Sequence, residues 1–293
     1  MRRTGPTRRG LMQASCAFAA WGLLPEFALA GSRDPRFVLV ILRGALDGLA
    51  AVPPLGDPDY AGLRGDLAVP ASGERAALRL DGFFGLNPNM PAVKALYDEG
   101  QALIAHAVAT PYRERSHFDG QDVLENGTPS PLGADTGWLN RAASAIPAGA
   151  AAQGRDLFAV GATVPLVMRG PAPVVTWSPA ALKQAHADTV LRLARLYGER
   201  DPALLAALTE GEKLDSMLAE GGGMAVAARG AGERRAFSVA AAAAGRVLAK
   251  PQGPRIAALA LDGWDTHAKE GPSAGRLANL LAALDDALGT LRR

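Results

Sequence analysis

The chain almost lacks cysteine. Its 293 residues include a single one, Cys16, which lies within the first thirty. Residues 31–293 therefore cannot form a disulfide, a zinc–thiolate site or a cysteine nucleophile. Aromatic residues are also scarce, at 5%, whereas hydrophobic residues reach 48%. That hydrophobic content excludes a wholly disordered chain, and we expect a core built mainly from Leu, Val and Ala.

An excess of positive charge is missing from most of the chain. The net charge is +2, but four arginines and one glutamate give residues 1–30 a net charge of +3. Subtracting the second value from the first leaves about −1 for residues 31–293. Nucleic-acid binding requires a basic surface, so no nucleic-acid partner is expected.

Long hydrophobic runs are absent too, and after residue 30 no segment of membrane-spanning length is free of charge. The short apolar run at 14–24 follows a basic stretch and precedes Ala28-Leu29-Ala30, which is the form of a secretory signal. Within it, Thr7-Arg8-Arg9-Gly10-Leu11-Met12 is similar to a twin-arginine export signal. We predict a signal peptide at 1–30, cut after Ala30 and bound by the twin-arginine export machinery. The product would be periplasmic or secreted, without a membrane span. An ordinary secretory signal with incidental arginines is the alternative.

Apolar runs alternate with helical patterns along the rest of the chain. Runs typical of buried strands in a parallel sheet lie at 37–42, 103–108, 157–160, 174–177 and 256–261. Helical patterns lie at 91–99, 117–126, 136–146, 179–218, 231–249 and 277–291. The alternation predicts an α/β fold in which helices cover a mostly parallel central sheet. We expect a single domain, 31–293, with the helical stretch 179–249 as an excursion packed on one edge.

Polar clusters follow three of the predicted strands, and ligands of open parallel sheets bind beyond the carboxyl ends of the strands. The first cluster, at 43–48, contains Asp47, which either offers a carboxylate to a cation or belongs to an Asp-Gly turn. The second, at 112–122, contains Ser116 and His117. Ser116 is a candidate nucleophile with His117 as its base. A metal-binding role for His117 and a helix-capping role for Ser116 are equally open.

The third cluster, at 262–267, places Asp265 and His267 two residues apart directly after a predicted strand. In an extended segment this spacing lets both side chains turn towards one cation, which favours a metal-ligand role. The alternative is an aspartate that caps the last helix and a histidine hydrogen-bonded nearby. Of the other histidines, His106 is expected in the core and His186 on a solvated helix face. The sequence has no phosphate-binding loop, dinucleotide fingerprint or nucleophile elbow.

Several segments together resemble one bacterial family, the exported domain-of-unknown-function family fifteen-oh-one. Besides the leader, they are Val-Leu-Val-Ile-Leu-Arg-Gly-Ala-Leu-Asp-Gly-Leu at 38–49, Gly-Asp-Pro-Asp-Tyr at 56–60, Ala-His-Ala-Val at 105–108, Arg-Ser-His-Phe-Asp-Gly-Gln-Asp at 115–122, Gly-Trp-Leu-Asn-Arg at 137–141 and Gly-Trp-Asp-Thr-His at 263–267. This family is grouped with the alkaline phosphatase and sulfatase superfamily.

The resemblance implies an alkaline-phosphatase-like α/β fold with a metal site at the carboxyl ends of its strands. It makes Asp47, Asp265 and His267 the expected ligands of a divalent metal ion, with zinc as the candidate, and places Ser116 or His117 near the reacting atoms. In that superfamily divalent cations activate a hydroxyl nucleophile that attacks a phospho- or sulfo-ester. The implied substrate is therefore a small anionic ester.

The chain also differs from the family, whose members continue with a Glu-Phe-Gly-Arg segment and a Thr-Asp-His-Gly-His-Gly segment. No Asp-His pair occurs in this sequence. We therefore expect a chain that is C-terminally incomplete relative to the family, with at most one weakly held divalent ion and little or no turnover. A non-catalytic exported binding protein of the same fold, or a truncated fragment, are the alternatives.

Overall fold

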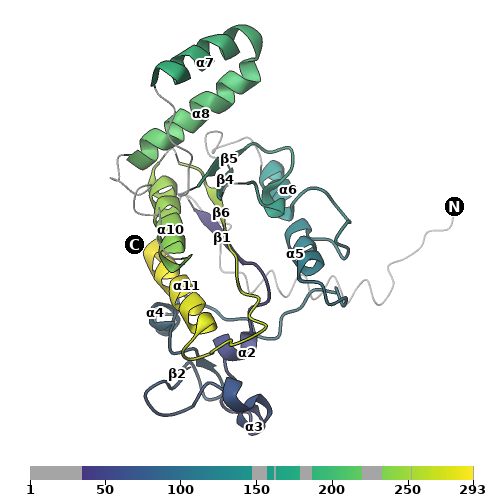
Figure 1. The fold of residues 1–293 in the computed structure, drawn as a ribbon, viewed down its shortest axis with the longest axis vertical. Coiled ribbons are helices and arrows are strands. Elements are labelled where there is room, and N and C mark those ends of the chain that lie inside the picture. The colour runs from purple at the N-terminus through teal and green to yellow at the C-terminus, as the bar shows by residue number, and fades with distance from the viewer. Residues whose placement is uncertain are drawn as a thin grey trace, which may run out of the picture. The chain divides into compact units, whose positions relative to one another are not determined.

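The computed structural model describes residues 35–146, 157–161, 163–178, 187–219, 233–251 and 253–292 (Figure 1). Arg36–Arg293 forms one compact unit. The predicted signal peptide at 1–30, its cleavage point and His186 lie outside the described residues. Among the described helices, none is long and apolar enough to cross a membrane.

A four-stranded parallel sheet forms the centre of this unit. Its strands are β1 (Phe37–Leu42), β4 (Leu157–Val160), β5 (Val174–Trp177) and β6 (Ile256–Leu261). Their order across the sheet is β1-β6-β4-β5, and every neighbouring pair is parallel. Ile256 lies opposite Phe37 on one side and Leu157 on the other, so the strands start in register. Four of the five predicted strands are therefore confirmed, together with their mostly parallel arrangement.

Helices cover both faces of the sheet, as continuous apolar strands require. On one face, Val38, Val40 and Leu42 belong to a core cluster with α10 (Glu233–Ala249) and α11 (Arg276–Arg292). On the other face, Leu39 and Ile41 belong to a cluster with α6 (Trp138–Ala145) and the 3-10 helix η3 (Leu166–Met168). Figure 1 shows α10 and α11 on one side of the strands and α5 and α6 on the other. The α/β prediction is confirmed at this level.

The remaining elements lie around this core. They are α2 (Gly48–Ala51), α3 (Tyr60–Arg64), η2 (Gly65–Leu67), the hairpin of β2 (Leu78–Arg79) and β3 (Gly85–Leu86), α4 (Pro91–Asp98), α5 (His117–Asn126), α7 (Ala187–Arg200) and α8 (Pro202–Ala219). The helices predicted at 91–99, 117–126, 136–146, 231–249 and 277–291 all begin and end within two residues of α4, α5, α6, α10 and α11.

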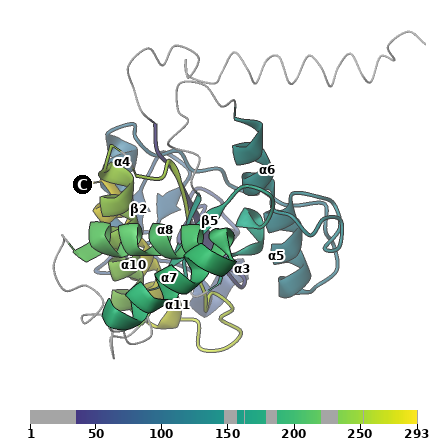
Figure 2. The same ribbon diagram turned by 90° about the horizontal axis from the view of Figure 1, so that it is seen from above.

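The helical stretch predicted at 179–218 is described from residue 187 and consists of two helices rather than one. Asp201 separates α7 from α8 because Pro202 disfavours a helical conformation at the residue before it. The Asp201 carboxylate then accepts hydrogen bonds from the amides of Ala203 and Leu204 and caps α8. Figure 2 shows α7 and α8 side by side, and α8 also contacts α10.

The prediction of a strand at 103–108 is wrong. This segment is irregular and pairs with no strand of the described sheet. Leu103 is 93% exposed and Val108 78% exposed, while Ile104 packs on the core and the His106 ring stacks on Phe84 at 4.9 Å. Alternate residues thus face inwards, as in a half-buried extended segment, until Ala107 adopts a positive φ of 56° and breaks the extension. One consequence is that β1 is an edge strand of the described sheet and only partly buried, not buried on both faces as predicted.

Candidate metal centre

The loops that follow β1 and β6 are joined at the carboxyl edge of the sheet. The Arg43 amide donates to the Leu261 carbonyl at 2.8 Å, and the Trp264 amide donates to the Arg43 carbonyl at 3.2 Å. Trp264 is fully buried and anchors the second loop. Gly44 has a φ of +118°, and a Cβ atom there would fall 2.5 Å from the Asp265 amide nitrogen. Glycine at 44 therefore lets the first loop pass directly against Asp265.

A partly buried ion pair fixes α5 to the same edge. Arg43 donates to the Glu125 carboxylate from Nε at 3.2 Å and from Nη2 at 2.8 Å. The other oxygen of Glu125 accepts from the Val167 amide at 3.0 Å, and Glu125 is buried. Glu125 thus ties α5 both to the end of β1 and to η3. Because His117 is the first residue of α5, these contacts hold its position relative to the two loops.

Three side chains meet where these segments converge. The Nε2 atom of His267 lies 2.9 Å from Oδ1 of Asp265, and Nε2 of His117 lies 3.5 Å from the same oxygen. One ligand atom from each residue lies within 4.8 Å of those of the other two. The two imidazole rings are 5.5 Å apart at an interplanar angle of 45°. Residues 150 positions apart in the chain therefore form one compact group of two imidazoles and one carboxylate.

The spacing of these atoms suits a shared metal ion. Two donor atoms bound at about 2.1 Å to one tetrahedral ion lie roughly 3.4 Å apart, which is between the two distances given above. Two histidines and one carboxylate form the ligand set of many catalytic zinc sites and of non-haem iron(II) sites. The side chains of His117 and Asp265 are 37% and 38% exposed and that of His267 is 77% exposed, so the group is open to solvent. A bound ion would keep room for water or a ligand.

Asp47, the other predicted ligand, has different partners. Its Oδ1 accepts hydrogen bonds from the amides of Leu49 and Ala50 and caps α2, and its Oδ2 forms an ion pair with Arg64. The carboxyl of Glu270 also lies against Asp47. Asp47 is not a member of the three-residue group. Its carboxylate has helix amides and a guanidinium as partners, so its contacts are those of a turn residue that also caps a helix, a role that was not predicted.

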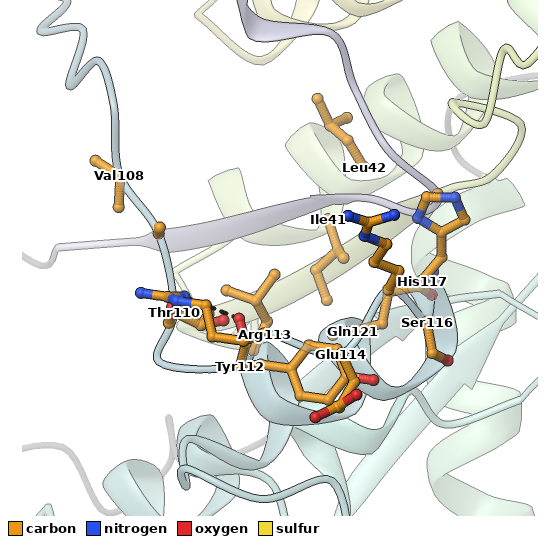
Figure 3. A pocket seen from close by; sticks show the side chains of 15 residues that line it. Ile41, Leu42, Val108, Thr110, Tyr112, Arg113, Glu114, Ser116, His117 and Gln121 are labelled. Atoms are coloured by element: carbon orange, nitrogen blue, oxygen red, sulfur yellow. Dashed lines mark hydrogen bonds between the residues drawn. The ribbon is translucent and has the colours of Figure 1, made fainter.

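Ser116 also has a local structural role. Its hydroxyl accepts a hydrogen bond from the Asp119 amide at 3.2 Å and caps α5. The Tyr112 hydroxyl donates to the Asp119 carboxylate at 3.0 Å. The pKa of Tyr112 is raised, mainly because the hydroxyl is shielded from solvent and secondly because of its hydrogen bond to this carboxylate. In Figure 3 the side chains of Ser116 and His117 point in opposite directions from the start of α5. The capping alternative is thus confirmed, and among the described contacts no hydrogen bond joins Ser116 to His117 as its base.

A pocket of about 600 Å³ opens beside His117 (Figure 3). Its wall comes from the end of β1, from the segment before α5 and from α5 itself, and Ile41, Tyr112 and Leu124 are among its lining residues. Such a volume lies within the range of small-molecule sites, about 300–1,000 Å³. The three-residue group therefore borders a cavity large enough for an organic ligand.

Other residues that shape this edge carried no signal in the sequence. Glu125 was predicted only as part of a helix, and Arg43 only as a neighbour of a turn. Nothing local marks them as partners, because their contact depends on α5 lying under the end of β1. Likewise, only the structure shows that Glu270 and Arg64 contact Asp47.

No protein-family model, curated protein or solved structure matches this chain.

Proposed function

We propose that this chain binds one divalent metal ion through His117, Asp265 and His267 and that it is a metal-dependent hydrolase of phospho- or sulfo-esters with little turnover. The observation that carries the proposal is the convergence of one donor atom from each residue within 4.8 Å, at the carboxyl edge of a parallel sheet. Ligand sites of such sheets lie at this edge. Zinc is the candidate ion because two imidazoles and one carboxylate form a common catalytic zinc set.

The chemistry follows from the ligand set. A divalent cation held by three protein ligands supplies an activated water and withdraws charge from an ester oxygen. In this chain the two histidines and Asp265 would hold the ion, while the buried Trp264 and the Arg43–Glu125 pair keep their loops in place. Family fifteen-oh-one, which the sequence resembles, fits this proposal through its Trp-Asp-Thr-His and Ser-His-Phe-Asp segments.

A second candidate function is ligand binding without turnover. The Ser116 hydroxyl caps α5, and Asp47 pairs with Arg64, so neither takes part in the three-residue group. The group then offers three ligands, fewer than a two-metal hydrolase site uses. Zinc-dependent release of 4-nitrophenol from 4-nitrophenyl phosphate or sulfate separates the two candidates, since a binding protein gives none.

We also propose that the protein acts outside the cytoplasm, exported through the twin-arginine route. The proposal depends on Arg8 and Arg9, on the short apolar run that follows them and on the small residues Ala28 and Ala30. Proteins that use this route fold before export, so the metal can be bound before the chain leaves the cytoplasm.

Zinc titration of the metal-free chain by calorimetry tests the metal site. The wild-type chain is expected to bind about one zinc ion, and Asp265→Ala is expected to weaken binding by about tenfold or more, roughly 1.4 kcal/mol per factor of ten. Asp262→Ala is the matched control, because Asp262 is an exposed aspartate on the same loop but outside the group. Equal affinities of the two variants would remove Asp265 from the site and contradict the proposal.

A further inference from the structure

The pocket beside His117 has an apolar wall that the described chain leaves uncovered. Ile41 and Leu42 line it from β1, Val108 from the irregular segment and Leu124 from α5. Val108 is 78% exposed and Leu124 is 59% exposed. Large apolar side chains that line a cavity and remain exposed favour a ligand with an apolar part, because such a ligand removes them from water.

The cationic residues of the pocket differ in their contacts. Arg113 donates hydrogen bonds to the carbonyls of Thr110 and Tyr112, and Figure 3 shows it turned towards Thr110. Arg115 has no ion pair or hydrogen bond with any described residue. It precedes Ser116 and His117, which line the same pocket. Arg115 is thus a guanidinium that lines the same pocket as His117 and is available to a ligand.

One acidic residue also lines the pocket. Glu114 is a lining residue, and Figure 3 draws it near Tyr112. An anionic group is therefore favoured at Arg115 and disfavoured at Glu114. The apolar wall and the Arg115 guanidinium together suit a ligand that is anionic at one end and apolar at the other.

We propose that this pocket binds a small phospho- or sulfo-ester of an apolar alcohol, with its anionic group at Arg115 and its apolar part against Leu124, Val108 and Ile41. The proposal rests on the proposed function, because it names the substrate class of the same site. Arg115 acts as a binding residue that pairs with the anion, since guanidinium groups match phosphate and sulfate oxygens in a bidentate manner.

Calorimetric titration of the zinc-loaded full chain with octylphosphonate and methylphosphonate tests the proposal, since phosphonates are not hydrolysed as esters are. Octylphosphonate is expected to bind at least about thirtyfold more tightly than methylphosphonate, because each buried methylene contributes roughly fourfold. Octyltrimethylammonium, with the same chain and the opposite charge, is expected to show no binding. Equal affinity for the two phosphonates, or tight binding of the cation, would overturn the proposal.

Two variants with matched controls locate the ligand. Arg115→Gln is expected to weaken both phosphonates by about tenfold, whereas Arg75→Gln, at an exposed arginine outside the pocket, leaves them unchanged. Leu124→Ser is expected to weaken octylphosphonate alone, whereas Leu132→Ser, at a leucine that is 94% exposed elsewhere, has no effect. Wild-type affinity in both Arg115→Gln and Leu124→Ser would contradict the proposal.

Failure of this proposal is distinguishable from failure of the proposed function. Suppose that zinc binding depends on Asp265, but that octylphosphonate binds no more tightly than methylphosphonate and its affinity is unchanged in Arg115→Gln. The pocket proposal is then wrong and the metal site stands. If zinc does not bind but octylphosphonate still binds in a manner that depends on Arg115 and Leu124, the pocket proposal holds for an anionic ligand and the hydrolase proposal is wrong.

Discussion

Asp47 illustrates at the scale of one residue how a carboxylate acquires its role from its neighbours. Two helix amides and Arg64 bind its oxygens, and the side chain of Glu270 lies against it. Burial, and then the charge of Asp47, raise the pKa of Glu270 above its ordinary value of 4.5. Ionised Glu270 is therefore less favourable in the folded chain than in the unfolded one. Its contribution to stability is present at low pH and is lost as the pH rises through its raised pKa.

Replacing Glu270 by glutamine removes this unfavourable charge. The free energy of unfolding of Glu270→Gln is expected to exceed that of the wild type at pH 7, and the difference is expected to shrink as the pH falls below the ordinary pKa. Urea unfolding at pH 7 and at pH 4 measures it. Glu74→Gln, at an exposed glutamate, reports the effect of removing a negative charge alone. A Glu270→Gln chain that is less stable than the wild type at pH 7 would contradict the interpretation.

At the scale of one element, α4 shows how a helix can be capped by a residue far away in the chain. Met90, at its N-cap position, makes no side-chain cap hydrogen bond, although Pro91 is well suited to the first turn. The Asp285 carboxylate on α11 instead accepts hydrogen bonds from the amides of Ala92 and Val93, at 2.9 and 2.8 Å. Asp285 is buried, so this cap also fixes α4 against α11.

Removing the cap is expected to destabilise the fold. Asp285→Ala leaves two helix amides without their acceptor, so the free energy of unfolding is expected to fall by about 2–3 kcal/mol. Asp286→Ala, at the exposed neighbour on the same helix, is expected to change it by less than about 0.5 kcal/mol. Chemical denaturation of both variants provides the comparison, and equal stabilities would show that Asp285 does not act as the cap.

Elements with a continuous apolar run or a clear helical period could be predicted from the sequence, and the segment 103–108 could not. The segment 103–108 is apolar except for His106, and the runs at 37–42 and 256–261 are wholly apolar. Of these three segments, only the two runs find a parallel partner in the described sheet. The composition of a segment indicates whether it can form a strand, whereas its pairing depends on which other segments lie beside it in the fold. The break between α7 and α8 was readable in principle, because Pro202 marks it.

At the scale of the whole molecule, a parallel sheet brings distant loops to one edge. This rule placed the loops after β1 and β6, and with them Asp265 and His267, at one edge. It does not account for His117, because the segment 103–108, which its cluster follows, is not a strand of the described sheet, and α5 brings His117 to Asp265 instead. It could not show that Asp47 would pair with Arg64, because that contact depends on the course of 48–64 after the strand ends. Nor could it reveal the Arg43–Glu125 pair, whose two residues are 82 positions apart. Edge position was predictable for the loops that follow β1 and β6, and the choice among side chains at that edge was not.

Export belongs to the same scale, since it concerns the route of the whole chain. Replacing both Arg8 and Arg9 by lysine is expected to abolish accumulation in the periplasm, because the twin-arginine receptor requires the arginine pair. Arg2 and Arg3 form a matched control pair in the same leader, and their replacement by lysine is expected to leave export unchanged. Cell fractionation and immunoblotting measure both variants. Normal periplasmic levels of the Arg8 and Arg9 variant would refute the twin-arginine assignment.

The metal centre is tested most directly by X-ray absorption spectroscopy of the zinc-loaded chain, which reports the atoms bound to the metal. With His117, Asp265 and His267 as ligands, the spectrum is expected to show two imidazole nitrogens and at least one oxygen at about 2.0–2.2 Å from zinc. In Asp265→Ala the imidazole signal is expected to weaken together with zinc content. A zinc spectrum without imidazole scattering, or one that is the same in the wild type and in His117→Ala, would contradict a centre made by these three residues.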